Sequence, residues 1–183
     1  MILGMSLTFK VLPSDRKQAN IKPIFKKGRK DQASNYHPIS LTPVVCKVLK
    51  STMNDALVTY LERNQSLSKS EHGFCKGYSI NTNLIETYDF VTRFLDDGLL
   101  VDVILLDQSK AFDKVQHQLL LLKMESYRVH EDIVAWIETF LTGRTQRVVV
   151  YDATSKNVYS DEIPVISGVP WGKILGPTLF GIY

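Results

Sequence analysis

Residues 101–106 read Val-Asp-Val-Ile-Leu-Leu and are followed directly by Asp107. This stretch is short, β-branched and nearly all apolar, which is typical of a central strand buried on both faces of a sheet. A carboxylate at the end of such a strand, next to the start of a helix, can hold a hard cation such as Mg²⁺. The alternative is an ordinary strand-end or N-cap aspartate, and the stretch alone does not decide between the two.

Patterned segments lie on both sides of this predicted strand. Apolar residues at helical spacing predict helices over about 44–63, 80–96, 115–126 and 130–141, and an apolar helix beginning within Ile174–Tyr183. Alternation and turn residues predict strands at Ile21–Phe25, Arg147–Tyr151 and Asn157–Val165, the last two forming a hairpin. The mixed order of helices and strands predicts an α+β fold.

Composition places the chain among ordinary globular proteins. It has 183 residues, of which 44% are hydrophobic and 22% charged, enough for about one domain with its own core. No apolar run approaches the roughly 20 residues of a membrane helix, and the N-terminus lacks the features of a signal peptide. Two cysteines, Cys46 and Cys75, cannot form a disulfide framework. We therefore expect an intracellular protein, nuclear or cytoplasmic, with no membrane partner.

Positive charge is concentrated at the start of the chain. Residues 1–50 hold 10 Lys/Arg and 2 Asp/Glu, whereas residues 51–183 hold 12 Lys/Arg and 17 Asp/Glu. The densest cations are Lys26, Lys27, Arg29 and Lys30. Clustered cations suit a phosphate backbone because their binding releases condensed counterions. A solvated turn between strands is the plainer interpretation of the same charges.

Other candidate residues carry weaker signals. The pair Asp96-Asp97 lies at the end of a predicted helix and is interpreted as a solvated helix terminus. The four histidines, at positions 37, 72, 117 and 130, show no metal-binding spacing. Three aromatic residues, Phe74, Tyr78 and Tyr88, could stack on bases, although helix-face aromatics more often pack in a core.

Several motifs follow one another in a fixed order along the chain. They are Ile24-Phe25-Lys26-Lys27-Gly28, Asn35-Tyr36-His37-Pro38-Ile39-Ser40-Leu41, Glu71-His72-Gly73-Phe74, Asp107-Gln108-Ser109-Lys110-Ala111-Phe112-Asp113, Trp136-Ile137, Phe140-Leu141, Ser167-Gly168-Val169-Pro170, Leu175-Gly176-Pro177 and Leu179-Phe180. From about Ser6 to Tyr183 this succession resembles the reverse transcriptase domain of non-LTR (LINE-type) retrotransposons of the jockey or chicken-repeat kind. The motifs are long and ordered, so the resemblance is specific.

The resemblance implies a right-hand polymerase fold that copies RNA into DNA from an RNA template, a DNA primer and deoxynucleoside triphosphates. Its chemistry is two-metal nucleotidyl transfer, with two Mg²⁺ ions held by carboxylates on palm strands. The chain would form a partial hand, with fingers and an incomplete palm but no thumb. The segments would be an N-terminal part of the fingers over 1–20, the fingers and fingers–palm helices over 21–100, and part of the palm over 101–183.

The resemblance also implies roles for individual residues. Asp107 matches the first catalytic, metal-binding aspartate, and the backbone carbonyl of Gln108 would be a second ligand. The nucleotide would be contacted around Lys110 and Ala111, and Phe112 would exclude a ribose 2′-hydroxyl. The remaining assignments place Trp171 and Gly172 in the loop that seats the nucleotide, and Lys26, Lys27, Arg29 and Lys30 on nucleic acid.

Several positions depart from the family pattern. In the NYRPIS motif the arginine is replaced by His37, and in the GFRxGRS motif the two arginines are replaced by Cys75 and Tyr78. A guanidinium binds phosphate through two parallel hydrogen bonds, which none of these three side chains can do. Trp171 replaces the glutamine of VPQGS, and Arg16 stands where many members have tryptophan.

The sequence ends at Tyr183, before the aromatic-Ala-Asp-Asp box that supplies the other two metal-binding aspartates in this family. One carboxylate cannot hold two ions, so we expect at most one weakly bound Mg²⁺ and no polymerase activity from this chain. The sequence resembles the translation of a truncated element copy or a fragment of a longer reading frame. Two alternatives remain: a non-catalytic module that binds RNA or DNA through its basic segment, and a poorly folding chain with no biochemical function.

Overall fold

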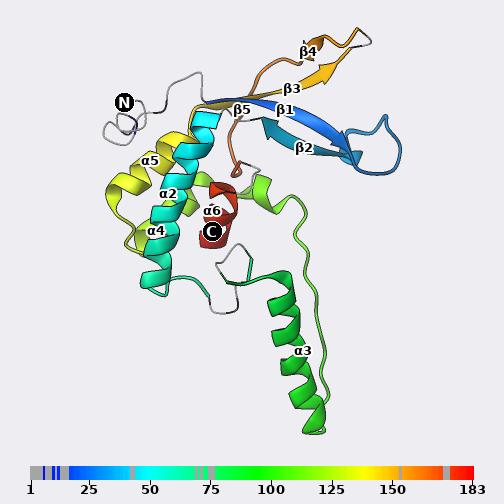
Figure 1. Ribbon diagram of the computed structural model, residues 1–183, viewed down its shortest axis with the longest axis vertical. Helices are drawn as coiled ribbons and strands as arrows, with labels where there is room; N and C mark the ends of the chain where they lie inside the picture. Colours follow the sequence, from blue (N-terminus) through cyan, green and yellow to red (C-terminus); the bar gives the residue numbers. More distant parts are fainter. Residues whose placement is uncertain are drawn as a thin grey trace.

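Four helices bury their apolar faces against one another and form the core (Figure 1). They are α2 (Val44–Arg63), α4 (His117–Ser126), α5 (Glu131–Leu141) and α6 (Leu175–Ile182). In α2 the fully buried Leu57 and Leu61 lie four residues apart, hence on one face of the helix. In α5 the rings of Trp136 and Phe140 stack 5.4 Å apart. The periodicity predicted α2 at its observed bounds and the other three helices to within two residues.

The computed structural model describes residues 6, 10, 12, 17–41, 44–68, 70, 72–73, 77–152, 154–170 and 174–183. Within these ranges, no helix is both long enough and apolar enough to span a bilayer.

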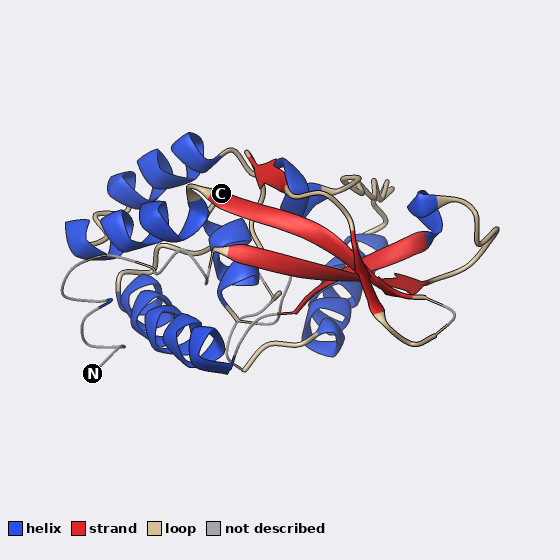
Figure 2. Cartoon of the chain, turned by 90° about the horizontal axis from the view of Figure 1, so that it is seen from above, coloured by secondary structure: helices blue, strands red, loops and turns tan. Residues whose placement is uncertain are grey.

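A five-stranded sheet lies beside the helices (Figure 2). Its strands are β1 (Gln18–Phe25), β2 (Tyr36–Leu41), β3 (Arg144–Tyr151), β4 (Asn157–Tyr159) and β5 (Ile163–Val165). The strand order is β2-β1-β3-β4, with β5 also paired to β3. Ile21 in β1 pairs with Ser40 of β2 in an antiparallel ladder and with Val148 of β3 in a parallel one. Helices and sheet together make a mixed α/β architecture.

Two strand predictions need correction in detail. The segment Asn157–Val165, expected as one strand, divides into β4 and β5, which pair antiparallel with successive parts of β3. β2 was not predicted as a strand, and it contains Pro38, which lacks a backbone donor. β2 tolerates this proline because it lies at an edge of the sheet.

Helix α3 (Ile80–Asp96) projects away from the other helices (Figure 1). It begins with a capping box in which the Ser79 and Thr82 side chains each accept a hydrogen bond from the other residue's backbone N–H. It ends at Asp96, and Gly98 follows the C-cap residue Asp97 with φ +73°, a conformation common just after a helix C-terminus. None of its residues is buried, and Tyr88 is 73% exposed. The expectation that Tyr88 packs in a core is therefore wrong.

The prediction of a buried central strand at 101–106 is also wrong. This segment is extended but pairs with none of the described strands. Leu105 and Leu106 are 90% and 89% exposed. A strand exists only when a neighbour takes its N–H and C=O groups, and composition alone does not supply that neighbour. Segment 99–106 and α3 together leave a large apolar surface uncovered by the described residues.

His72 holds the preceding loop against the start of α3. Its Nε2 lies 2.5 Å from Glu86 Oε2, and its Nδ1 lies 3.0 Å from Thr82 Oγ1. The Tyr78 ring meets the imidazole edge-on, with centroids 4.7 Å apart. His72 is thus a buried structural residue, and about half of the Tyr78 side chain stays exposed.

The unequal burial of two leucines gives a stability prediction. Leu57→Ala opens a cavity in the helical core and is expected to cost about 2–5 kcal/mol of unfolding free energy. Leu105→Ala removes an exposed side chain and is expected to change it by less than about 0.5 kcal/mol while lowering the binding of a hydrophobic dye. Chemical denaturation measures both. A comparable loss for Leu105→Ala would mean that segment 99–106 is packed.

Candidate functional site

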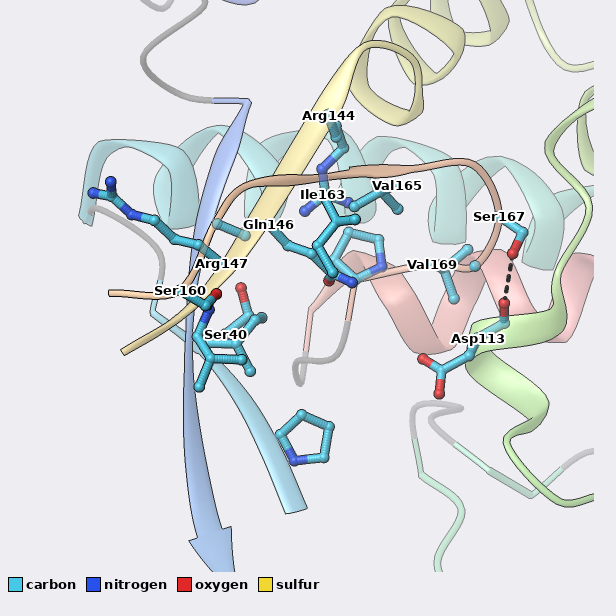
Figure 3. A pocket seen from close by; sticks show the side chains of 16 residues that line it. Ser40, Asp113, Arg144, Gln146, Arg147, Ser160, Ile163, Val165, Ser167 and Val169 are labelled. Atoms are coloured by element: carbon cyan, nitrogen blue, oxygen red, sulfur yellow. Dashed lines mark hydrogen bonds between the residues drawn. The ribbon is translucent and has the colours of Figure 1, made fainter. Parts of the chain in front are cut away.

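The segment that begins at Lys110 is held by the loop that precedes α6. The Gly168 N–H donates to the Val115 carbonyl at 2.8 Å, and the Val169 N–H donates to the Phe112 carbonyl at 2.9 Å. The Ser167 hydroxyl donates to the Asp113 carbonyl at 3.0 Å (Figure 3). These three bonds join segments more than 50 residues apart in the sequence. We call the contact between residues 112–117 and 167–170 the junction.

His117 closes the junction from its other end. The ring Nε2 of this first residue of α4 lies 2.8 Å from the Gly168 carbonyl oxygen. Because a carbonyl only accepts, Nε2 carries the proton and donates. No sequence pattern predicted this role for His117, since the role depends on a loop 51 residues away.

Two glycines permit the close approach of backbone at the junction. Gly168 has φ +87°, and a Cβ placed there would lie 2.9 Å from Asp113 Cα and 3.0 Å from the Phe112 carbonyl oxygen. A Cβ on Gly176 would lie 2.2 Å from the Pro170 carbonyl oxygen. Any larger residue at either position forces backbone to move. Each of these two positions therefore requires glycine because neighbouring backbone atoms fill the space of a Cβ.

Phe112 is fixed by stacking as well as by its carbonyl. Its ring stacks on Phe180 of α6 with centroids 4.7 Å apart and planes 19° apart. The short 3₁₀ helix η3 (Ala111–Lys114) carries this ring, and Lys110 precedes it in the left-handed conformation with φ +57°. Lys110 and Ala111 directly precede Phe112, the residue that the junction bonds to the loop before α6.

The other predicted residues of this site are placed differently. Asp107 and Gln108 lie in the exposed extended segment ahead of the junction. Trp171 and Gly172 lie outside the described residues, as do Arg16, Phe74 and Cys75. Whether Asp107 and Gln108 approach a bound nucleotide stays a prediction.

The described residues do not fit a site for two metal ions. They contain no group of three or more His, Cys, Asp or Glu side chains that could hold one ion. Asp96 and Asp97 form the exposed end of α3, which confirms their interpretation as a solvated helix terminus. Asp107 alone could supply one carboxylate to a cation, with water completing the shell.

The basic residues lie in the turn that joins β1 to β2. Lys26, Lys27, Arg29 and Lys30 are all exposed there. Asn35 shapes the turn: its side-chain amide donates to the Arg29 carbonyl at 2.8 Å, and its carbonyl accepts from the Lys26 N–H at 2.8 Å. A Cβ on Gly28, which has φ +89°, would lie 2.7 Å from Asn35 Nδ2, so the Asn35 side chain would have to move.

The four cations of this turn are not equivalent. Arg29 holds the Asp31 carboxylate with two nitrogens, at 2.6 and 3.1 Å, and this lowers the pKa of Asp31 below its ordinary value. Lys30 Nζ lies 5.8 Å from the centroid of the Phe25 ring. Lys26 and Lys27 show no ion pair with any described residue. The positive electrostatic potential of the turn therefore comes mainly from Lys26, Lys27 and Lys30.

The two remaining histidines, His130 and His37, lie at a helix N-terminus and on an edge strand. His130 is the N-cap of α5, where its Nδ1 accepts the Asp132 N–H at 3.2 Å. His37 is exposed on β2. None of the four histidines belongs to a metal-binding group of described residues.

Comparison with known proteins gives a consistent result. A family profile described as "Reverse transcriptase (RNA-dependent DNA polymerase)" matches residues 24–183. The chain is 28% identical over 184 residues to the RNA-directed DNA polymerase from mobile element jockey of Drosophila funebris, and 27% identical over 185 residues to that of Drosophila melanogaster. It is 28% identical over 189 residues to the probable RNA-directed DNA polymerase from transposon X-element of Drosophila melanogaster. These alignments cover 100% of the chain but only 19–20% of each relative, so the chain spans about one fifth of their length.

The contacts of Gly168 predict a difference between two glycine substitutions. Gly98 and Gly168 both have positive φ, but a Cβ on Gly98 meets nothing within 4 Å. Gly98→Ala should cost about 1 kcal/mol from backbone strain alone. Gly168→Ala should cost roughly 2–4 kcal/mol because the methyl group also forces the junction apart. Urea unfolding of both variants checks this, and equal losses would mean that the junction is looser than described.

Proposed function

Since the chain belongs to the reverse transcriptase family, as a domain of non-LTR retrotransposons, we propose that it is the part of such an enzyme that seats the nucleotide and the template. The observation that carries this proposal is the junction. It fixes Phe112, which directly follows Lys110 and Ala111, against the loop before α6 and against the ring of Phe180. We further propose that the fold is a partial polymerase hand, and that the chain by itself does not extend a primer.

The rigid placement of Phe112 suits selection between sugars. A ring stacked on Phe180, with its own carbonyl bonded to Val169, cannot swing away at low cost. A wall in a fixed position discriminates by clash, so one extra hydroxyl on a ribose is rejected. We propose that Phe112 takes this role in the intact enzyme, with Lys110 and Ala111 contacting the triphosphate.

The expected inactivity rests on the carboxylates. In the family, two Mg²⁺ ions would polarise the attacking hydroxyl and the triphosphate, and both must be held by protein oxygens at fixed positions. Within the described ranges, Asp107 belongs to no group of three or more His, Cys, Asp or Glu side chains that could hold a metal ion. It also lies in an exposed segment that forms no strand pairing with described residues. Neither condition favours a catalytic metal pair.

Primer extension tests the inactivity. With an RNA template, a DNA primer, all four deoxynucleotides and Mg²⁺, we expect no extended product from the chain or from Asp107→Asn. The variant is the matched control, because a contaminating polymerase would give product in both samples. Extension by the unmodified chain that Asp107→Asn abolishes would overturn the proposal of inactivity and leave the family assignment intact.

A second candidate function is non-catalytic binding of RNA or DNA through the β1–β2 turn. The supporting observation is that Lys26 and Lys27 are exposed and carry no ion pair with described residues. Arg29, by contrast, already binds a carboxylate and offers less net charge to a phosphate. We propose that any affinity for nucleic acid arises mainly from the lysines.

A salt titration of RNA binding tests this second function. The double substitution Lys26→Ala with Lys27→Ala should weaken binding and reduce the slope of log K against log[salt] by about 0.7 per lost phosphate contact with a single strand. Arg29→Ala should have the smaller effect, because it removes one cation instead of two and that cation already binds the Asp31 carboxylate. Affinity that responds neither to salt nor to the lysine substitutions would rule this function out.

A further inference from the structure

A cavity of about 320 Å³ lies where the sheet meets the loop before α6 (Figure 3). β1, β2, β3 and β5 line it, together with residues 167–170. On β2 the residues that face it are Pro38 and Ser40, so His37 and Ile39 lie on the opposite face of that strand. The cavity therefore lies on the opposite face of β2 from His37.

Arg144, the first residue of β3, is the unusual member of this lining. It is only 8% exposed. Among the described residues, its guanidinium forms no hydrogen bond and no ion pair. The guanidinium carbon lies over the Phe140 ring, 5.3 Å from the centroid. Figure 3 shows the side chain extending from β3 toward the other lining residues. A buried guanidinium with five donors and no acceptor is unfavourable unless an anion completes it.

A second cation lies close to the first. Lys50 of α2 places its Nζ 5.4 Å from the centroid of the same Phe140 ring. Burial, together with the Arg144 charge, lowers the pKa of Lys50 to about 8, and burial lowers the pKa of Arg144 to about 10. Both groups are mainly charged at neutral pH, and neither has a carboxylate partner among the described residues. The Arg144 end of the cavity is thus electropositive.

The other charged residues of the lining do not cancel this field. Arg147 donates to Asn20 Oδ1 at 2.9 Å and lies 3.8 Å from Glu162 Oε1, and in Figure 3 it extends away from the cavity. Asp113 lies beside Ser167, on the far side of Val169 from Arg144 (Figure 3). The polar residue nearest to Arg144 along β3 in this lining is Gln146, which can donate through its amide.

We propose that this cavity binds a phosphate group through the Arg144 guanidinium, with the Gln146 amide as a neutral donor. A guanidinium matches a phosphate with two parallel hydrogen bonds, and Lys50 adds charge without needing direct contact. The phosphate can belong to a nucleic-acid backbone or be free in solution, because the recognised group is the same. This site does not depend on polymerase activity or on the basic turn.

Thermal unfolding in inorganic phosphate, against sodium chloride of equal ionic strength, tests the proposal. A ligand that binds only the folded chain raises the Tm, so the Tm of the unmodified chain should rise with phosphate. Arg144→Met should lose this rise, and its Tm in chloride should equal or exceed that of the unmodified chain, because an uncompensated buried charge is removed. Arg144→Lys should bind phosphate roughly tenfold more weakly, having lost the two-pronged geometry.

Arg93→Met is the matched control, since it removes one positive charge from exposed helix α3. It should retain the full phosphate effect. Equal Tm increases in all four proteins would show only solute exclusion and would overturn the proposal. A Tm of Arg144→Met lowered by the same amount in chloride and phosphate would also overturn it, because Arg144 would then be a structural cation.

A competition experiment distinguishes the two sources of phosphate. A single-stranded RNA without terminal phosphates is bound to the chain and inorganic phosphate is added. If a backbone phosphate occupies the cavity, Arg144→Met lowers RNA affinity several-fold and phosphate displaces RNA from the unmodified chain only. If the site takes free phosphate, Arg144→Met leaves RNA affinity unchanged but still loses the Tm increase. Either result supports the cavity as a phosphate site. If Arg144→Met keeps both its RNA affinity and its Tm increase in phosphate, the proposal is contradicted.

Discussion

The carbonyl groups of Phe112 and Val115 accept hydrogen bonds from the N–H groups of Val169 and Gly168, and the arrangement of the site depends on this pairing. It joins the residues after the extended segment to the loop that leads into α6. Because α6 packs in the helical core, the junction connects the Phe112 ring to the most buried part of the molecule. Gly168 makes this approach possible, and Gly176 lets α6 lie close to Pro170, since neither position has room for a side chain.

The stretch immediately before the junction behaves in the opposite way. Segment 99–106 carries the most apolar run of the chain but forms no ladder with described strands, and α3 beside it buries nothing. The described part of the chain thus combines a well-packed helical core with an apolar arm that finds no cover within it. Asp107 lies between the two, after the uncovered arm and before the fixed junction.

Local patterns predicted the helices well. Recurrence of apolar residues at helical spacing gave α2 and α3 at their observed bounds, because each helix satisfies its own backbone. Strands were predicted less well, because their hydrogen bonds come from elsewhere in the chain. Residues 101–106 have ideal strand composition and no partner, whereas β2 contains a proline and pairs along its whole length with β1.

The site shows the same division. The ordered motifs include Phe112 and Gly168, and the described contacts place both residues at the junction. No sequence pattern indicated that His117 bonds to the loop, that Asp31 binds Arg29, or that Arg144 is buried with no ion pair among the described residues. Each of these contacts depends on how the folded backbone places the residues, either across a long stretch of sequence or within a turn. A count of charges along the sequence does not distinguish paired from unpaired cations.

Amide hydrogen exchange at Gly168 and Val169 tests the central claim most directly. Both residues lie in an irregular loop, where unbonded amides exchange rapidly. If the junction holds as described, both amides are protected to nearly the same degree as amides in the middle of α5, while amides of 101–106 exchange at the rate of an unstructured chain. Rapid exchange at Gly168 and Val169, with protection at 101–106, would contradict the account.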